Sequence, residues 1–193
     1  MQKIKTSHYD ILFSNQNSSF INDIIFKNKY SKVFILVDSN TKKYCLKLFL
    51  KKHLSEIKIQ LITIKNGEEN KNTKSLNSIW INISKLGGDR NSLLINLGGG
   101  MISDLGGFVA STYNRGIDFI NIPTTLLSMV DASIGGKVGI NIEKLKNMVG
   151  VFNYPKLILI DTSFLQTLPK RELKSGFGEM LKHGLIFDKK YFK

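Results

Sequence analysis

The sequence predicts an α/β fold built on a mostly parallel sheet. Short apolar runs rich in β-forming residues alternate along the chain with segments of helical periodicity. The runs lack the polar alternation of half-exposed strands, which is typical of strands buried on both faces of a parallel sheet. One run leads directly into three glycines, which places a turn at the end of a buried strand.

The expected elements follow one another in a regular order. The predicted strands are residues 32–38, 58–64, 92–100, 118–124 and 156–161. The predicted helices are residues 40–54 and 76–86, a helix that follows the three glycines, and residues 169–187. The character of the sequence changes after Asp161, because only helical periodicity follows that residue.

Length and composition narrow the class of protein. A chain of 193 residues is long enough for one sizeable domain, or for one domain and the beginning of another. Cys45 is the single cysteine, which excludes an intramolecular disulfide and indicates a reducing compartment. The first residues lack the apolar core of a signal peptide, and no apolar run approaches the roughly 20 residues that span a bilayer. We expect a cytoplasmic protein without a membrane partner.

The formal net charge of +13 raises the question of nucleic-acid binding. The lysines are spread along the whole chain among asparagines and isoleucines, however, and they form no concentrated stripe. We therefore expect no nucleic-acid partner, and attraction of small anionic ligands explains the charge at least as well.

The clearest functional motif runs from Asn96 to Gly116. Three glycines end a strand there, so the backbone can approach a ligand closely, and the start of the next helix suits a pyrophosphate. Ser103 or Asp104 is expected to cap that helix. Ser103 stands where the dinucleotide fingerprint has its third glycine, so a plain tight turn remains an alternative.

Two further stretches carry polar groups at strand ends. Asp38 and Asn40 follow the first predicted strand, where they are suited to bind a ribose or an adenine, or to cap the next helix. The stretch of residues 121–152 is dense in groups that suit a hydroxylated, phosphorylated acid, although each is also explained as a cap or turn residue. These groups are Thr124, Thr125, Asp131, Lys137, Asn141, Lys146 and Asn147.

The last predicted helix is amphipathic. Its apolar face carries Leu173, Phe177, Met180, Leu181, Gly184 and Leu185, and its polar face carries Glu172, Ser175, Glu179, Lys182 and His183. Glu179 and His183 have the spacing of two metal ligands on one face. The competing interpretation of this polar face is solvated surface.

Four segments together resemble the 3-dehydroquinate synthase family of the sugar-phosphate cyclases, from Gly98 to Gly184. They are "GGGMISDLGGFVASTYNRG", "IPTTLLSMVDASIGGKVGIN", "KNMVGVF" and "TLPKRELKSGFGEMLKHG". The resemblance implies a Rossmann-like NAD-binding domain with a parallel sheet over residues 1–160. Residues 161–193 would then be the truncated start of an all-α domain that binds metal and substrate.

The resemblance also implies an activity. Such enzymes are phosphate lyases of the shikimate pathway, which leads to the aromatic amino acids. They convert 3-deoxy-D-arabino-heptulosonate 7-phosphate, a small phosphorylated sugar acid, into 3-dehydroquinate and phosphate, with catalytic NAD+ and a divalent metal, Zn2+ or Co2+. A homodimer is expected. A non-catalytic dinucleotide-binding fragment and a related cyclase with another ring product remain alternatives.

Site residues are carried over from the same resemblance. The implied catalytic residues are Arg115, Asp131, Lys137, Asn147 and Lys182, with Arg115 reaching the site of a neighbouring subunit. The implied cofactor residues are Asp38, Asn40, Asn66, Glu68, Lys71, Gly99, Gly100, Met101, Ile102, Ser103, Asp104, Thr124, Thr125, Lys137, Lys146, Phe164, Leu165, Gln166 and Thr167. Asn66 departs from the aspartate that usually begins its loop.

Glu179 matches the first metal ligand of the family. The other two ligands are histidines expected beyond Lys193, and none of His8, His53 and His183 matches them. His183 is therefore set aside as a ligand despite its spacing. We expect the chain to be the amino-terminal part of a longer enzyme, inactive alone and with an uncovered apolar face on its last helix.

Overall fold

A computed structural model describes residues 2–14, 20–54 and 57–187. The strands are β1 (Gln2–Lys5), β2 (Asp10–Phe13), β3 (Lys32–Asp38), β4 (Ile59–Ile64), β5 (Ser92–Gly98), β6 (Asp118–Pro123), β7 (Lys137–Ile142), β8 (Leu145–Phe152) and β9 (Leu157–Ile160). The α-helices are α1 (Phe20–Asn28), α2 (Ser39–Tyr44), α3 (Leu46–His53), α4 (Thr73–Lys85), α5 (Gly100–Thr112) and α6 (Lys170–Ile186). Short 3-10 helices are η1 (Glu68–Asn70), η2 (Tyr113–Arg115) and η4 (Thr162–Thr167), and η3 (Ser128–Ala132) is a π-helical turn.

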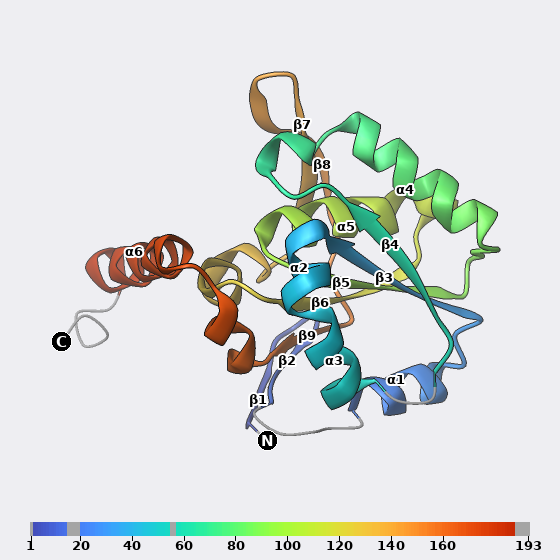
Figure 1. Cartoon of the computed structure of the whole chain (residues 1–193), viewed down its shortest axis with the longest axis horizontal. Helices are drawn as coiled ribbons and strands as arrows, with labels where there is room; N and C mark the ends of the chain where they lie inside the picture. The colour runs from blue at the N-terminus through green and yellow to red at the C-terminus, as the bar shows by residue number, and fades with distance from the viewer. Residues whose placement is uncertain (1, 15–19, 55–56, 188–193) are drawn as a thin grey trace.

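The sheet confirms the predicted α/β fold. It has seven strands in the order β1-β2-β9-β6-β5-β3-β4, and every pairing is parallel except that of β1 with β2. Helices α1, α2 and α3 lie on one face and α4 and α5 on the other (Figure 1). Along β3, Val33, Ile35 and Val37 join the core on the first face, while Phe34 and Leu36 join the core on the second.

The five predicted strands correspond to β3, β4, β5, β6 and β9. The helix expected over residues 40–54 is divided at Cys45 into α2 and α3. Three parts of the fold were not predicted: the strands β1 and β2, helix α1, and the antiparallel hairpin of β7 and β8. In that hairpin Gly139 and Gly150 face each other so closely that a methyl group on either would collide with the opposite backbone.

Helix α5 packs closely against two neighbours at adjacent positions. A side chain on Gly106 would collide with Asn96 of β5, and one on Gly107 would collide with Val138 of β7. The helix is therefore in direct contact with both the sheet and the hairpin. It begins at the turn formed by Gly98, Gly99 and Gly100, which we call the glycine turn, and it connects this turn to both of them.

Helix α6 lies at one side of the molecule, next to η3 (Figure 1). Half of its expected apolar face is uncovered, since Phe177, Leu181 and Leu185 are 50%, 56% and 70% exposed. Leu173 and Met180 are partly buried and Gly184 is buried, so the expectation of an uncovered apolar face is confirmed only in part. Within the described residues, no helix combines the length and the apolar character that a membrane span requires.

Candidate cofactor and metal site

The site lies at the carboxyl edge of the parallel sheet, where open α/β folds bind their ligands. Gly98 at the end of β5 is opposite Pro123 at the end of β6, and the Thr124 N–H donates to the Gly98 carbonyl at 3.0 Å. The two predicted cofactor segments, the glycine turn and the Thr124–Thr125 pair, are therefore direct neighbours.

The glycine turn is shaped for close approach of a ligand. A Cβ atom on Gly99 would lie 3.0 Å from the Thr125 Cγ2 atom, and one on Gly100 would lie 3.0 Å from the Ala132 Cβ atom. No side chain caps α5, whose N-cap residue is Gly99. The N–H groups of its first turn, at Gly100, Met101 and Ile102, thus suit an anionic group such as a pyrophosphate.

The expectation that Ser103 or Asp104 caps this helix is wrong. The helix begins directly after the turn, at Gly100, so both residues lie inside it. The Ser103 hydroxyl donates to the Gly99 carbonyl at 3.4 Å, and the Asp104 carboxylate binds Lys71 instead.

Asp38 takes the capping role that was one of its two interpretations. Its Oδ1 atom accepts hydrogen bonds from the Asn40 and Thr41 N–H groups, both at 2.8 Å, at the start of α2. The Asn40 side chain is exposed beside it. The Asn66 Oδ1 atom accepts a hydrogen bond from the Ser39 hydroxyl at 2.7 Å, which ties the loop before η1 to the same helix start.

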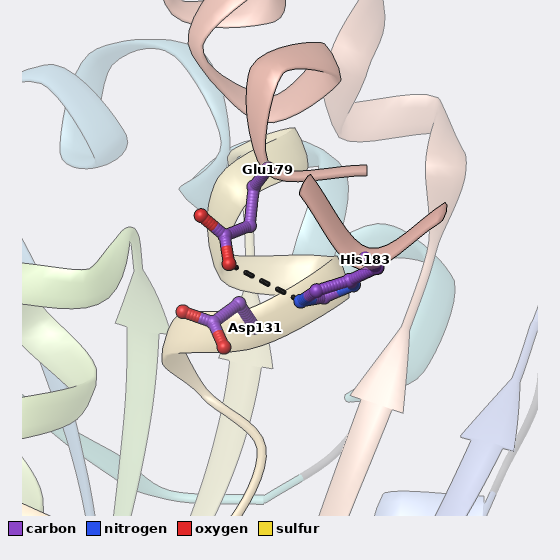
Figure 2. A group of neighbouring side chains, drawn as sticks. All are labelled: Asp131, Glu179 and His183. Carbon is purple, nitrogen blue, oxygen red and sulfur yellow. Dashed lines mark ion pairs between the residues drawn. The ribbon is translucent and has the colours of Figure 1, made fainter. Parts of the chain in front are cut away.

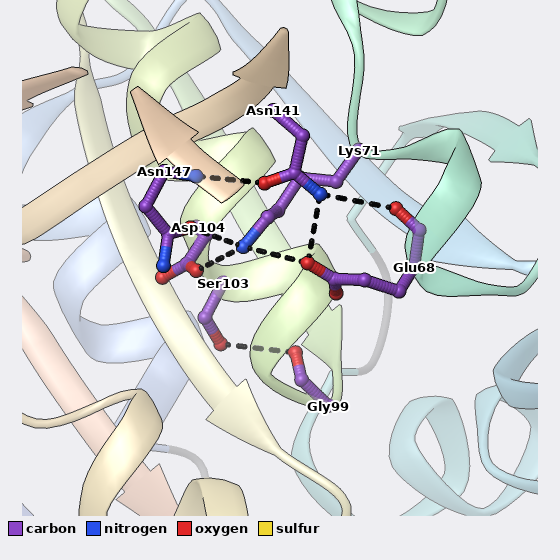
Figure 3. Close-up of polar contacts among 7 residues, drawn as sticks. All are labelled: Glu68, Lys71, Gly99, Ser103, Asp104, Asn141 and Asn147. Carbon is purple, nitrogen blue, oxygen red and sulfur yellow. Dashed lines mark hydrogen bonds and ion pairs between the residues drawn. The ribbon is translucent and has the colours of Figure 1, made fainter. Parts of the chain in front are cut away.

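Lys71 joins three segments of the chain in one polar network (Figure 3). Its ammonium donates to Asp104 of α5 at 2.9 Å and to the Asn147 Oδ1 atom of β8 at 2.6 Å, and it pairs with Glu68 at 3.1 Å. Asn141 completes the network, because it donates to the Glu68 carboxylate at 2.9 Å and accepts from the Asn147 N–H at 2.9 Å. The implied site residues of three distant segments therefore meet here.

The charges in this network depend on one another. Burial lowers the pKa of Lys71, but Asp104 and Glu68 outweigh that effect and the net pKa is raised. Burial raises the pKa of Asp104 more than the hydrogen bond from Lys71 lowers it. Lys71 therefore carries its charge at neutral pH, and it offsets the cost of the mostly buried carboxylate of Asp104.

A cavity of about 340 Å³ opens beside the network, between α5 and the hairpin. Its lining includes Asp104, Lys137, Asn147, Met148 and Phe152. One carboxylate, one ammonium and one amide thus face a space that is otherwise lined by apolar groups, which is the usual make-up of a small-molecule site. Lys146 is exposed at the start of β8.

A second cluster lies where α6 meets η3. The ligand atoms of Asp131, Glu179 and His183 all lie within 4.8 Å of one another (Figure 2). The His183 Nε2 atom is 3.1 Å from Glu179, and Lys182 also pairs with Glu179. Two carboxylates and an imidazole are a donor set that suits Zn2+ or a similar divalent ion, so these residues fit a metal.

The Glu179 carboxylate has the negative charge that a metal ligand needs. The hydrogen bond from Lys182 lowers the pKa of Glu179, and Lys182 and His183 add favourable charge, so the group is ionised at neutral pH. The side chain is only 16% exposed, because this face of α6 is turned toward η3. Solvated surface therefore does not describe the environment of Glu179.

Two implied groups remain, of which Arg115 lies away from the site and η4 follows β9 at the same edge of the sheet. Arg115 is in η2 with a φ of 68°, beyond the end of α5 that is opposite the glycine turn. Helix α5 has 13 residues and is therefore about 20 Å long. Arg115 for this reason does not reach the site of its own chain. In η4 the Phe164 side chain is buried in the core, while Gln166 and Thr167 are exposed and Leu165 is partly buried.

The comparisons with known proteins agree with this geometry. Residues 61–175 match the family described as 3-dehydroquinate synthase N-terminal. The 3-dehydroquinate synthase of Parabacteroides distasonis is 46% identical over 184 residues, covering 93% of this chain and 51% of the relative. That of Pelagibacter ubique is 42% identical, covering 98% of this chain and 52% of the relative. The chain thus spans about half the length of the curated relatives it matches.

Solved structures show the same arrangement of elements. A 2-epi-5-epi-valiolone synthase from Streptomyces hygroscopicus subsp. jinggangensis, with NAD+ and Zn2+ bound, is 29% identical with a TM-score of 0.82 over 98% of this chain and 53% of its own. A 2-deoxy-scyllo-inosose synthase complexed with carbaglucose-6-phosphate, NAD+ and Co2+ is 25% identical with a TM-score of 0.80 over 92% of this chain and 48% of its own. With the family model matching more than half of its residues, the chain belongs to the 3-dehydroquinate synthase family.

Proposed function

We propose that this chain forms the NAD+-binding part of a 3-dehydroquinate synthase. Such an enzyme converts 3-deoxy-D-arabino-heptulosonate 7-phosphate into 3-dehydroquinate and phosphate. The observation that carries the proposal is the position of η3. One end of this turn touches the glycine turn through Ala132, and its Asp131 belongs to the cluster with Glu179. A dinucleotide and a metal would therefore lie on adjacent sides of one substrate.

The described residues divide into three tasks. The first turn of α5 binds the pyrophosphate, and the nucleotide lies against Asp38, Asn40 and the loop from Asn66 to Lys71. Glu179 holds a Zn2+ or Co2+ ion beside Asp131. Lysines neutralise the phosphate and carboxylate of the substrate, for which we assign Lys137, Lys146 and Lys182.

The bound groups supply what side chains cannot. NAD+ supplies reversible oxidation of a ring hydroxyl, and a divalent ion polarises the oxygen concerned. The protein orients the two and excludes water, and its lysines make the departure of phosphate easier because they offset the negative charge that develops on it. A carbon–oxygen bond breaks in that step, and phosphate leaves with the electron pair of that bond. The hydride taken up by NAD+ would then return to the same substrate, so the enzyme is a phosphate lyase without net redox change.

The remaining assignments rest on the family. We infer that residues 1–160 are the NAD-binding domain and that residues 161–193 begin a helical domain. We assign Arg115, in η2 beyond the far end of α5, to the site of a second subunit in a homodimer. A cytoplasmic location is consistent with a biosynthetic enzyme of this kind.

Binding of NAD+ tests the cofactor site directly. Calorimetric titration of the chain should show saturable binding, and Gly100→Val should weaken it at least about tenfold, because the new side chain would fill the space next to Ala132. Gly178→Val is the matched control, since a Cβ atom there meets nothing within 4 Å. A chain that does not bind NAD+, or equal losses in the two variants, would contradict the assignment.

Phosphate release tests the reaction. The chain alone, with NAD+, Zn2+ or Co2+ and substrate, should release none. The same chain joined to the unmatched half of the Pelagibacter ubique relative should release phosphate from 3-deoxy-D-arabino-heptulosonate 7-phosphate but not from glucose 6-phosphate. NAD+ binding without release from the joined protein would favour a non-catalytic dinucleotide-binding fragment, and release from glucose 6-phosphate would favour a related cyclase.

A further inference from the structure

A buried charged cluster lies outside the site, where α3 ends next to the end of β9. The Asp161 side chain is fully buried, and its Oδ2 atom is 2.8 Å from the His53 Nε2 atom and 2.6 Å from the Lys52 ammonium. The His53 side chain is also fully buried, and that of Lys52 is 12% exposed. We call Lys52, His53 and Asp161 the Asp161 clamp.

The two carboxylate oxygens of Asp161 bind different parts of the chain. Oδ2 binds the end of α3, as described above. Oδ1 accepts from the Ser163 N–H at 2.9 Å and from its hydroxyl at 2.6 Å, which makes Asp161 the N-cap of η4. Lys52 also donates to the Ser163 hydroxyl at 3.1 Å. The clamp therefore fixes the start of η4 to α3, across 108 residues of sequence.

Asp161 is ionised in the clamp. Burial alone would raise the pKa of Asp161, but hydrogen bonds from His53, Lys52 and Ser163 outweigh burial and hold the pKa well below its usual range. A buried ion pair of this kind often adds little net stability compared with apolar residues of the same volume. Such a pair fixes the relative orientation of the segments that it joins, because charge-assisted hydrogen bonds are short and geometrically demanding.

The segment that the clamp holds is the one that the family resemblance assigns to the cofactor. Phe164 is buried in the same hydrophobic cluster as Phe49 of α3, so η4 is anchored at its start and in its middle. Gln166 and Thr167 are left exposed at its end. The segment follows β9 at the carboxyl edge of the sheet, the edge that also carries the glycine turn.

We propose that Lys52 and His53, acting through Asp161, are positioning residues that hold residues 162–167 in the orientation needed for nucleotide binding. Neither residue needs to touch the nucleotide. The affinity for NAD+ is thereby set in part from the end of α3. This inference rests on the proposed function, because it takes NAD+ as the ligand.

Amide hydrogen exchange measures how strongly the clamp holds η4, and it needs no ligand. The informative amides are those of Phe164, which donates to the Asp161 carbonyl at 3.3 Å, and Leu168, which donates to the Leu165 carbonyl at 3.1 Å. Asp161→Asn and Lys52→Met should each speed exchange at these amides about tenfold, since each removes a charge-assisted hydrogen bond. Lys51→Met, at the neighbouring exposed lysine, should leave the exchange rates of these amides unchanged. Lys52→Arg keeps the positive charge and should keep their protection.

NAD+ titration of the same variants reads the consequence. Asp161→Asn and Lys52→Met should each raise the dissociation constant about fivefold. The double variant should be no worse than the more affected single variant, because both substitutions break one unit. Lys51→Met and Lys52→Arg should bind as the unmodified chain does.

The outcomes separate the inference from the proposed function. Unchanged exchange at Phe164 and Leu168, or faster exchange spread evenly over the sheet, would overturn the clamp. Local loosening with unchanged NAD+ affinity would overturn its role in nucleotide binding. An unmodified chain that fails to bind NAD+ would contradict the proposed function and with it this role, while the exchange measurement would still show whether the clamp holds η4.

Discussion

Strand β5 and helix α6 bury their residues in opposite ways. All seven residues of β5 are buried, and its leucine and isoleucine side chains fill the cores on both faces of the sheet. In α6 the only residues classed as buried, among those described, are Gly176 and Gly184. Its charged Glu179 is turned inward, while Phe177 and Leu181 are turned outward.

This difference separates a region whose buried residues stabilise the fold from one whose polar groups suit binding. The sheet gains its stability from apolar area removed from water, and the described residues supply both sides of that contact. Helix α6 packs through glycines and presents carboxylate and imidazole groups to η3. Such a surface adds little to folding, but it suits an ion or a substrate.

The largest expected effect compares one substitution in the two regions. Leu94→Ala in β5 should lower the free energy of unfolding by roughly 3 to 5 kcal/mol, because Leu94 is fully buried. Leu181→Ala in α6 should change it by less than about 0.5 kcal/mol, because Leu181 is 56% exposed. Urea unfolding followed by circular dichroism measures both. Equal losses would mean that the apolar face of α6 is covered in solution.

The same contrast holds for two ion-paired lysines. Lys71→Met should lower the free energy of unfolding by roughly 2 kcal/mol, because Asp104 would keep a mostly buried carboxylate without its partner. Lys182→Met removes an exposed partner of Glu179, which keeps His183 Nε2 at 3.1 Å, and should lower stability less than Lys71→Met does. Lys74→Met, at an exposed position in α4, controls for the loss of one positive charge. A Lys71→Met chain as stable as its Lys74→Met control would contradict the network.

Metal affinity tests the inward face of α6. Titration with Co2+, followed by visible absorption, should show binding that Glu179→Gln weakens about tenfold or more, since a first ligand is lost. His183→Gln should have a smaller effect, because the family resemblance sets His183 aside as a ligand. Glu172→Gln, exposed in the first turn of α6, should have none. A loss in His183→Gln as large as that in Glu179→Gln would make His183 a ligand.

The smallest expected effect concerns acid stability. The folded-state pKa of Asp161 is lowered, so its carboxylate stabilises the fold above its unfolded pKa of about 3.9. That contribution is lost as the pH falls through the lowered folded pKa. The stability difference between the unmodified chain and Asp161→Asn should therefore shrink as the pH falls below about 4. Urea unfolding at several pH values measures it, and a difference that grows in acid would contradict the pKa shift.

The central strands were predictable from sequence because burial on both faces leaves an uninterrupted apolar run. β1 was not, since its four residues are exposed and only pairing with β2 defines it. The hairpin of β7 and β8 was missed because lysines and asparagines interrupt its pattern. Its tight crossing at Gly139 and Gly150 is a property of two strands, which no single run of residues shows.

The candidate site was predictable in its parts and not in its connections. The glycine turn follows from the sequence, but the start of α5 was misplaced, since both serine and aspartate are common N-cap residues. The contact of Lys71 with Asn147 spans 76 residues, and nothing in either segment indicates it. Lys52, His53 and Asp161 gave no signal at all, because a basic helix end and an aspartate after a strand are ordinary features.

Gly106 and Gly107 have a consequence for how much variation the site tolerates. They determine how closely α5 approaches β5 and β7, and Asp104 lies on the same rigid helix two residues earlier. A single methyl group at either glycine would push the helix outward and carry Asp104 away from Lys71. The alignment of the polar network thus depends on two positions that have no functional group, and a survey of tolerated substitutions should find them as restricted as the charged residues themselves.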